Sequence, residues 1–422
     1  MTDLRVLHLT TELPHPTAIS GGSSRQFHLL TGLASLGVEV TVVAPVSDAQ
    51  SAELRPLETL RERGVDLLVA PRQRTRGREA VLAFAREPRL LTRSLSMPLH
   101  ALQTEMLAQG MRGPSNTGFA RNPNIISIEH DYATALLDVL PHAADSIVKV
   151  LTLQNVTAEY YRVRAESSSG VRRFVHQRSS RAATRYITSQ LKHFDTLIAV
   201  SEYDAQLTKR SAPDANVVVI PNGTATADPK SIGRRSDLGN TVLFTGTMSH
   251  PPNSEGASWF LDEIWPIIKL RVPDARFVIV GREPSADLFD AAHKLSDVEV
   301  IGEVPSMASW YESSTVSVAP LLSGSGTRLK ILDSMSGSCP VVTTSLGCQG
   351  LDVQHGEHVL IADAAQEFAS RVIEALELPD KREQLAGAGR RLVEENYDWA
   401  KLSAKFKVVL EDALSRGGRS GS

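Results

Sequence analysis

A glycine-rich loop followed by two basic residues, in the stretch SGSGTRLK, is the part of the sequence that points most clearly to chemistry. Gly324 and Gly326 lack a Cβ atom, so the backbone can approach a ligand closely there. The pattern predicts a helix from about Thr327, and the N–H groups at a helix start favour an anion. Arg328 and Lys330 add two positive charges at that start. Together these residues predict a site for a phosphate group.

A carboxylate one turn later extends this candidate site. Asp333 can accept hydrogen bonds from sugar or ribose hydroxyls, and the following run CPVVT is typical of a buried parallel strand. A ligand that combines phosphate and hydroxyl groups, such as a nucleotide sugar, would suit the site. Glycine-rich loops before helices also serve as simple turns, and Asp333 would favour the helix dipole without touching a ligand. The loop alone leaves these alternatives open.

The composition is that of a globular protein with two domains. The chain has 422 residues, of which 42% are hydrophobic and 22% charged, and its net charge of -3 gives no general attraction for nucleic acid. Two cysteines, Cys339 and Cys348, indicate no disulfide framework and are typical of a reducing cytoplasm. The sequence shows no signal-peptide pattern and no apolar run long enough to span a bilayer. We therefore expect a cytoplasmic protein, and peripheral contact with the inner membrane face stays open.

Strand-like and helix-like segments alternate along both halves of the chain, which indicates parallel βαβ units and an α/β fold. The first helix is expected to begin near Ser24, after a glycine turn, and to end at Gly37. An amphipathic helix is expected over 254–270, and helices dominate from about 365 to 415. The expected strands are 6–10, 38–44, 124–128, 147–153, 196–200, 241–245, 276–280, 298–301, 316–320 and 341–343.

The polar stretch 221–240, rich in Gly, Pro, Ser and Asp, predicts a connector between two doubly wound domains. Open α/β sheets bind ligands beyond the carboxyl ends of their strands, and two such domains would form a cleft between them. The loops expected to line the cleft therefore follow strands, at 20–24, 129–132, 246–253 and 323–329.

The second half of the chain closely resembles the nucleotide-binding domain of retaining family-4 glycosyltransferases of the bacterial group 1 type, which have the GT-B fold. The matching stretches follow the expected order between Thr241 and Trp399, and they are VLFTGTMSHPPNSEGASWFLDEIWPII, RVPDARFVIVGREP, VEVIGEVPSMASWYESSTVSVAPL and SGSGTRLKILDSMSGSCPVVTTSLGCQGL. The first half shows weaker cues, which are ISGGSSRQFHLLTGLASLGVEVTVVAP, LQN, FDTLIAVSEYD and VVVIPNG.

This resemblance implies two Rossmann-like doubly wound domains that face each other across a cleft. The expected parts are an acceptor-side domain (1–220), a linker (221–240), a domain that binds the nucleotide sugar (241–398), and a helix that crosses back to the first domain, followed by a tail (399–422). The implied activity is transfer of a sugar from a nucleotide sugar to an acceptor hydroxyl with retention, in the biosynthesis of polysaccharides or glycosylated metabolites. The expected acceptor is a carbohydrate, a lipid-linked molecule or a small molecule, and no nucleic acid partner is expected.

Enzymes of this kind usually need no metal, and we expect no metal or other cofactor beyond the nucleotide sugar as co-substrate. The sequence contains no Asp-x-Asp pair. The neighbouring residues Glu129, His130 and Asp131 are a conceivable metal cluster, but adjacent positions rarely face one ion. The metal-free interpretation is therefore favoured.

The chain departs from the family pattern in both donor loops. Relatives commonly carry two glutamates in the glycine-rich loop and helix start, and these positions here hold Ser325 and Asp333. Many relatives also hold the diphosphate with an Arg and a Lys after the first strand of this domain, where this chain has Thr247 and Asn253.

We hypothesise that the missing positive charge has moved to the opposite loop. Arg328 can make a bidentate phosphate contact and Lys330 a point-charge contact. The alternative, which is stronger for Lys330, is that the side chain is simply solvated at the start of a helix.

The first half contributes fewer candidates. The resemblance brings Gly21 and Gly22 near the donor phosphates and His130 near the reacting sugar, although the glycines can be a simple turn and the histidine structural. Gln154 stands where relatives often have His, and Gln349 where they often have Glu. The candidate catalytic residues are His130, Arg328 and Lys330, and the candidate donor-binding residues are Gly21, Gly22, Thr247, Asn253, Ser325, Gly326, Thr327 and Asp333.

Two stretches of the first half are rich in arginine, one from Arg72 to Arg93 and one from Arg162 to Arg185. They can dock an anionic acceptor or a membrane face. Solvated helix faces are the simpler explanation for most of these arginines.

Two other functions stay open at this point. A nucleotide-sugar epimerase of the same fold would need acid–base carboxylates in the cleft, and the serine at position 325 argues against it. A non-catalytic partner protein that binds a nucleotide sugar is kept open by the departures at Thr247, Asn253, Ser325 and Asp333. Product analysis without any acceptor would identify the epimerase, and nucleotide binding without turnover would identify the partner protein.

Overall fold

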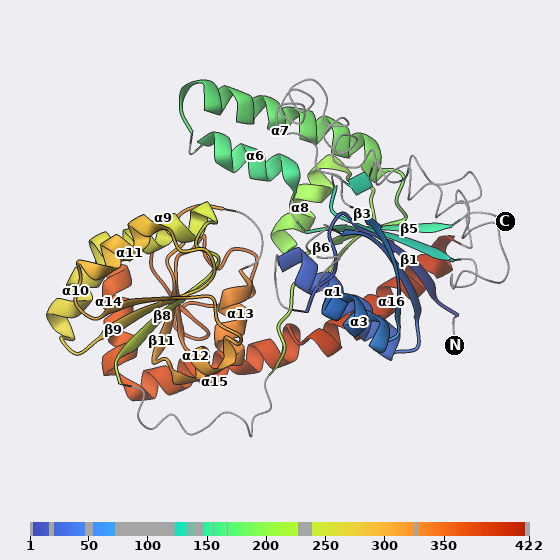
Figure 1. Ribbon diagram of the computed structural model, residues 1–422. Coiled ribbons are helices and arrows are strands. Elements are labelled where there is room, and N and C mark those ends of the chain that lie inside the picture. The colour runs from blue at the N-terminus through green and yellow to red at the C-terminus, as the bar shows by residue number, and fades with distance from the viewer. Residues whose placement is uncertain are drawn as a thin grey trace. The chain divides into compact units, whose positions relative to one another are not determined.

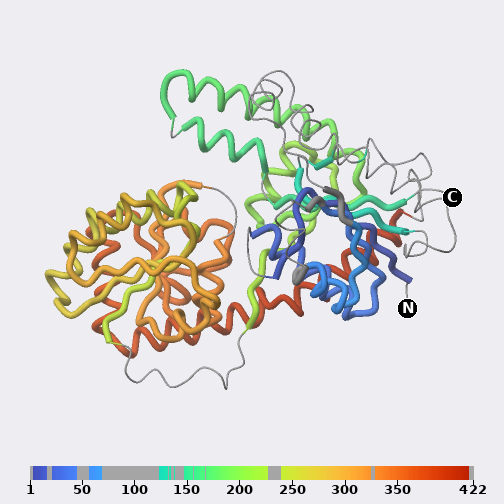
Figure 2. Tube along the Cα trace, viewed as in Figure 1, coloured from blue at the N-terminus to red at the C-terminus, as the bar shows by residue number. Residues whose placement is uncertain are grey.

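The computed structural model describes residues 3–16, 21–46, 54–71, 123–131, 133–134, 137, 147–154, 156–166, 168–226, 239–324 and 328–417. The chain divides into two units, one made of Met1–Pro221 with Ala400–Ser422 and the other of Asn222–Trp399. It passes from one unit to the other twice, near residues 221 and 399 (Figure 2).

The first unit alternates strands with helices (Figure 1). Its described strands are β1 (Arg5–Leu9), β2 (Glu39–Val46), β3 (Val65–Pro71), β4 (Ile125–Glu129), β5 (Val148–Leu153), β6 (Thr196–Ala199) and β7 (Val217–Val219). Its described helices are α1 (Gly21–Ser35), α3 (Leu54–Glu62), α6 (Thr157–Glu166), α7 (Gly170–Leu191), α8 (Glu202–Ser211) and α16 (Trp399–Gly417), the last of which starts at the boundary residue.

These strands form one parallel sheet in the order β3-β2-β1-β4-β5-β6-β7. The strand order reverses between β1 and β4, which pair from Val6 opposite Ile125 to Leu9 opposite Ile128. All five residues of β4 are buried, as expected for a strand with helices on both faces. On one face, the sheet packs against Ile187 of α7.

The C-terminal helix α16 packs within this unit. The Ser403 hydroxyl donates to the His28 carbonyl at 3.4 Å, and Lys407 Nζ donates to the Leu36 carbonyl at 3.0 Å. Gly32 of α1 lies directly against Ser403, so any larger residue there would push the two helices apart.

The second unit has the same plan. Its described strands are β8 (Thr241–Thr245), β9 (Arg276–Val280), β10 (Val298–Gly302), β11 (Val316–Ala319), β12 (Val341–Thr343) and β13 (Leu360–Ile361). Its described helices are α9 (Pro251–Trp259), the π-helical turn η3 (Phe260–Ile264), α10 (Trp265–Arg271), α11 (Ala286–His293), α12 (Ala308–Ser313), α13 (Leu329–Ser336), α14 (Ala365–Glu377) and α15 (Pro379–Asn396).

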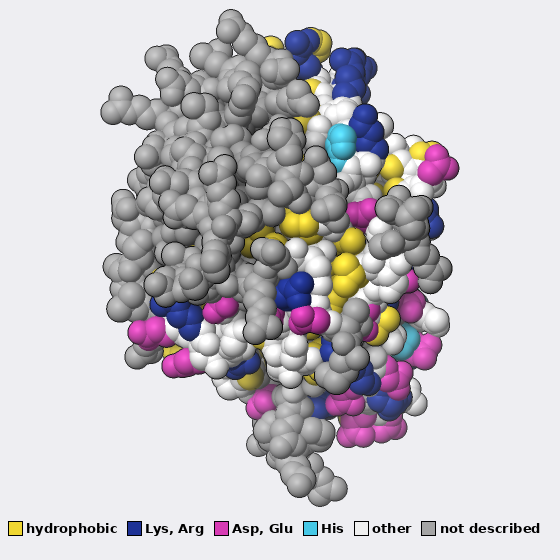
Figure 3. Space-filling view, turned by 90° about the vertical axis from the view of Figure 1, so that its right-hand side faces the viewer, with side chains coloured by type: hydrophobic (Ala, Val, Ile, Leu, Met, Phe, Trp, Pro, Cys, Tyr) yellow, Lys and Arg dark blue, Asp and Glu magenta, His cyan; other side chains and the backbone are white. Residues whose placement is uncertain are grey.

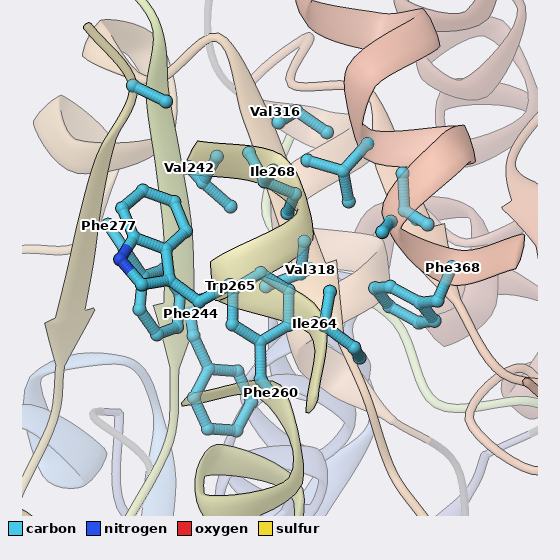
Figure 4. Packing of buried hydrophobic residues seen from close by; sticks show 14 of the residues in the cluster. Val242, Phe244, Phe260, Ile264, Trp265, Ile268, Phe277, Val316, Val318 and Phe368 are labelled. Atoms are coloured by element: carbon cyan, nitrogen blue, oxygen red, sulfur yellow. The ribbon is translucent and has the colours of Figure 1, made fainter. Parts of the chain in front are cut away.

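The second sheet is also parallel, in the order β10-β9-β8-β11-β12-β13. Its core on one face joins alternate residues of the strands, such as Val242 and Phe244, to aromatic residues of the helices (Figure 4). Phe260 lies 4.3 Å from Phe277 between ring centroids, and Trp265 packs beside them. Leu243, which points to the opposite face, packs in a separate cluster with Tyr311.

The predicted α/β class with two Rossmann-like doubly wound domains is confirmed by these two sheets. The expected helix over 254–270 is wrong in detail, because it begins at Pro251 and is interrupted by η3. Pro266 has no N–H to donate to the preceding turn, and the Trp265 N–H instead bonds the Phe260 carbonyl, five residues back.

Candidate functional site

Each sheet has one point where the strand order reverses, and open α/β sheets bind ligands beyond the carboxyl ends of the strands at such a point. In the second unit this point lies between β8 and β11. The chain that follows β8 leads into α9, and the chain that follows β11 leads into α13.

Lys330 and Asn253 meet at this point in the second unit. Lys330 Nζ donates to Asn253 Oδ1 at 2.8 Å, and Asn253 Nδ2 donates to the Thr247 carbonyl at 2.8 Å. The ammonium group also lies 4.5 Å from the centroid of the Phe244 ring at the end of β8. The structure therefore brings together three of the candidate residues, although Lys330 and Asn253 are 77 positions apart.

Glycine is required where β8 ends. A Cβ atom on Gly246 would stand 2.7 Å from Asn253 Nδ2 and 2.9 Å from Lys330 Nζ, which real Cβ atoms do not tolerate. Gly246 has φ 153, and Gly281 at the end of β9 would collide with the Gly246 carbonyl if it carried a side chain. Because Gly246 and Gly281 carry no side chains, the Lys330 side chain can reach the carboxyl end of β8.

The cations at this site are held in a poorly solvated environment. Burial, helped by repulsion from Arg328, lowers the pKa of Lys330 to about 7. Burial also lowers the pKa of Arg328 to about 10. Among the residues that the structure describes, no carboxylate forms an ion pair with Lys330. An anion bound beside Lys330 would supply the negatively charged partner that this ammonium group lacks among the described residues.

Asp333 lies one turn after Lys330 on α13. The Thr224 hydroxyl donates to Asp333 Oδ1 at 2.6 Å. Burial raises the pKa of Asp333 to about 6, against this hydrogen bond, which lowers it. The carboxylate is thus anchored through one oxygen by the segment that begins the second unit.

The glycine-rich loop is described only in part. Ser325, Gly326 and Thr327 lie outside the described residues. The helix expected from about Thr327 begins instead at Leu329, with Arg328 as the residue before it and Arg328 Nη2 3.5 Å from the Ser323 carbonyl. Gln349 is exposed in a turn after β12.

In the first unit, the equivalent point between β1 and β4 holds His130. Its Nε2 lies 3.2 Å from Glu12 Oε1, so residues that follow the two strands meet there. Burial opposes the charge on the ring, but the bond to Glu12 and the nearby charges of Glu129, Glu12 and Asp131 outweigh it and raise the pKa of His130. Its φ of 74 is unusual for a residue other than glycine and turns the chain sharply after β4.

A buried polar network continues from Glu12. Gln26 Nε2 donates to Glu12 Oε1 at 3.2 Å, and Gln26 Oε1 lies 3.1 Å from His8 Nε2. The other nitrogen of His8 lies 3.2 Å from the Ser127 hydroxyl of β4. The network therefore links α1, β1 and β4.

Glu129 forms a second part of this network with Arg25. Gln154 Nε2 donates to Glu129 Oε1 at 2.6 Å, and Arg25 Nε lies 3.8 Å from the same oxygen. Arg25 is 1% exposed and also donates to the Pro221 carbonyl at 2.7 Å, and burial lowers its pKa to about 10. Glu12, Arg25 and the contacts of Glu129 were not predicted from the sequence. The usable signal was that Glu129 ends β4 and Glu12 lies in the loop after β1.

The predicted glycine turn before the first helix is corrected by the structure. Gly21 and Gly22 are the first two residues of α1, which begins three residues earlier than expected. A Cβ atom on Gly22 would collide with Gln154 Oε1 and stand 2.5 Å from Glu12 Oε1. Gly22 therefore lets the helix start pack against the polar network.

The carboxylates beside His130 point to separate partners. Asp131 accepts from the Thr157 backbone N–H at 2.8 Å and from its hydroxyl at 2.5 Å, whereas Glu129 faces Gln154 and Arg25. Within the described part of the chain, no group of three His, Cys, Asp or Glu residues could hold a metal ion. None of the helices in this described part is both long and apolar enough to cross a membrane.

Comparison with known proteins identifies the family. A model described as Glycosyltransferase Family 4 matches residues 19–228, and a model described as Glycosyl transferases group 1 matches residues 239–378. The chain is 25% identical over 273 residues to an uncharacterized 44.6 kDa protein in the cps region of Klebsiella pneumoniae, covering 62% of this chain and 69% of that protein.

Solved structures share the whole fold. HepE of Anabaena, in complex with UDP and glucose, matches with a TM-score of 0.65 and 14% identity over 96% of this chain and 99% of that chain. Sucrose-phosphate synthase of Thermosynechococcus elongatus matches with a TM-score of 0.70 and 14% identity over 98% of this chain and 100% of that chain. With the two domain matches in chain order and both sheets in place, this protein belongs to the family-4, group 1 glycosyltransferases with the GT-B fold.

Proposed function

We propose that this glycosyltransferase moves a sugar from a nucleotide-sugar donor to an acceptor hydroxyl, with retention at the anomeric carbon and without a metal, in the biosynthesis of polysaccharides or glycosylated metabolites in the cytoplasm. The donor nucleotide binds to the second unit at the carboxyl ends of β8 and β11. The acceptor, a carbohydrate, lipid-linked molecule or small molecule, binds to the first unit.

One observation carries the donor site. Lys330 Nζ stands between Asn253 and the Phe244 ring at the reversal point of the sheet, without a carboxylate partner among the described residues. Burying such a cation costs free energy, which a bound diphosphate would offset by Coulomb attraction and hydrogen bonding. HepE, which has the same fold, binds UDP and UDP-glucose. This supports UDP as the first nucleotide to test.

The roles of the cations follow from where negative charge develops during sugar transfer. As the bond between the sugar and the diphosphate breaks, negative charge grows on the leaving phosphate oxygen. Lys330 and Arg328 would stabilise that charge, and the N–H groups at the start of α13 would add to it. The leaving phosphate can itself accept the proton of the acceptor hydroxyl, so we assign no protein base.

On the acceptor side, we propose that His130 contacts the reacting sugar. Its raised pKa favours the charged imidazolium, which can donate a hydrogen bond to a sugar hydroxyl. Glu12 is a positioning residue, because it holds His130 Nε2 at 3.2 Å.

The first test is thermal stabilisation of the full protein by UDP, GDP, ADP and dTDP, with a chelator present. A ligand that binds only the folded state raises its stability. We expect one nucleotide to raise the melting temperature, and Arg328→Ala to weaken its affinity by at least about tenfold through loss of a charge-assisted contact. Arg391→Ala, at an exposed position of α15, is the matched control and should leave the affinity unchanged.

Three outcomes would contradict the proposal. If no nucleotide stabilises the protein, the donor site is wrong. If Arg328→Ala binds as tightly as the wild type, the relocated phosphate contact is wrong. Retention needs a separate measurement, in which NMR of the product compares the anomeric configuration with that of the donor, and inversion would refute it.

A further inference from the structure

The helices α6 and α7 form a hairpin that projects from the first unit (Figure 1). The two helices are joined by a hydrogen bond from the Ser180 hydroxyl to the Ala158 carbonyl at 2.8 Å and by stacking of Tyr161 on His176. The Tyr203 hydroxyl of α8 donates to Glu159 at 2.8 Å and ties the hairpin to the rest of the unit. These contacts hold the two helices of the hairpin together and fix the hairpin to α8.

The beginning of α7, beside the turn of the hairpin, exposes large apolar side chains. Val171 is 79% exposed, Phe174 is 65% exposed and Val175 is 47% exposed. Their spacing of three and four residues puts them on one face of the helix. Exposed apolar groups gathered in this way mark a surface for a partner, because each exposed side chain forgoes the free energy of burial.

Arginines extend the same face along α7. Arg178, Arg181 and Arg185 follow Phe174 at intervals of four, three and four residues, and all three are exposed. Helix α7 contains no acidic residue, and no carboxylate in the described part of the chain forms an ion pair with these arginines. In Figure 3, Lys and Arg side chains gather at the top of the view, the height at which α7 lies in Figure 1.

The neighbouring helix behaves differently. Arg162 of α6 is neutralised by Glu159 and by Glu166 at 2.5 Å. On the opposite side of α7, Ile187 and Leu191 are buried in the core of the unit. The apolar and basic face of α7 therefore lies on the side of the helix opposite the residues buried in the core of the unit.

We propose that this face of α7 docks the protein on an anionic lipid surface. Phe174 and the two valines enter the boundary between headgroups and acyl chains, while the three arginines bind lipid phosphates. A second copy of the chain is disfavoured as the occupant, because two α7 faces would bring like charges together and neither carries an acid to pair with them. The proposal is independent of the donor chemistry.

Co-sedimentation of the full protein with vesicles tests the proposal. We expect binding to vesicles of phosphatidylglycerol and phosphatidylcholine, and none to phosphatidylcholine alone. Replacing Arg178, Arg181 and Arg185 together by Gln should weaken binding by roughly fivefold per arginine, or about a hundredfold. The control triple Arg276→Gln, Lys294→Gln and Arg391→Gln removes the same charge from exposed positions of the second unit and should bind as the wild type does.

Insertion of the apolar part needs its own measurement. Both native cysteines are buried, so Phe174→Cys can be labelled selectively with a fluorophore that reports its surroundings. We expect a blue shift with anionic vesicles, and no shift for the label at Val408→Cys, an exposed position of α16.

The proposal is overturned if the wild type does not bind anionic vesicles, or if both triple variants lose the same affinity, which would indicate a general charge effect. It is also overturned if Phe174→Ser dissociates a dimer and vesicle binding is absent, since the face would then be a contact between copies. Melting temperatures equal to that of the wild type establish that the variants are folded.

Discussion

The side chain of Lys330 carries a positive charge in a poorly solvated position, which lowers the stability of the folded protein. Its ammonium group is held by Asn253 and the Phe244 ring, and burial lowers its pKa to about 7. An unfolded chain would carry the same lysine with a pKa of 10.5. The folded state therefore binds this proton less tightly than the unfolded state does.

The free energy of unfolding therefore depends on the protonation of Lys330 and changes with pH. Between about pH 7 and pH 10.5 the unfolded state binds the proton and the folded state does not, so the Lys330 contribution to stability rises with pH in this window. Lys330→Met removes that dependence. We expect the variant to exceed the wild type in free energy of unfolding by roughly 1–3 kcal/mol at pH 7 and by less at pH 9.

Urea unfolding of both proteins at pH 7, 8 and 9 measures this difference, and Lys294→Met, at an exposed site, is the control that should show no such trend. A constant difference between Lys330→Met and the wild type would contradict the lowered pKa. Lys330→Met should also bind the nucleotide more weakly. A variant that is more stable but binds more weakly would show that the loss of affinity does not come from unfolding.

At the scale of elements, close approach of a helix to a loop shapes the proposed donor site. Gly256 of α9 lies against the Pro320 carbonyl, in the chain that follows β11. The helix that follows β8 can approach this loop only because Gly256 has no side chain. This packing sets the position of Asn253, one turn earlier in α9, relative to Lys330.

Two glycines in helices offer a matched test of this packing. Alanine normally stabilises a helix relative to glycine by about 1 kcal/mol, and Gly387→Ala in α15 should show this gain because only the flexible Arg391 side chain lies nearby, at 3.4 Å. Gly256→Ala should instead lower the free energy of unfolding by about 2 kcal/mol, since a backbone carbonyl cannot yield. Calorimetry that found the same sign for both variants would contradict the tight contact.

At the scale of the whole molecule, the chain builds two units on the same plan, each with its own core and one reversal of strand order. Each reversal point gathers polar residues from loops that are distant in sequence: Glu12 and His130 in the first unit, and Asn253 and Lys330 in the second. The proposed donor site and the buried polar network therefore lie at equivalent positions of the two sheets.

Nucleotide binding should be visible as protection in one unit. We expect UDP, or whichever nucleotide binds, to slow amide hydrogen exchange in peptides that cover 246–253 and 328–336, because binding reduces local opening there. Peptides of α7 serve as the internal control and should exchange at the same rate with and without ligand. Protection confined to the first unit would contradict the assignment of the donor site.

Much of this could be predicted from the sequence alone. The alternation of apolar strands with helices led to the α/β class, and the strands 241–245 and 276–280 were predicted with the bounds that the structure has. The strands that were missed, β3, β7 and β13, are edge strands of their sheets. β7 has three residues and β13 has two, so each apolar run is too short to be identified as a strand by its periodicity.

The sequence by itself determined which residues can carry charge at the proposed donor site, since Arg328 and Lys330 follow a glycine-rich loop at the end of a strand. Only the tertiary structure decided their partners. Lys330 meets Asn253 across 77 positions, and Thr224 meets Asp333 across 109. The physical reason is that local periodicity specifies strands and helices, whereas the order of strands in a sheet, set by packing over long sequence separations, decides which loops lie side by side.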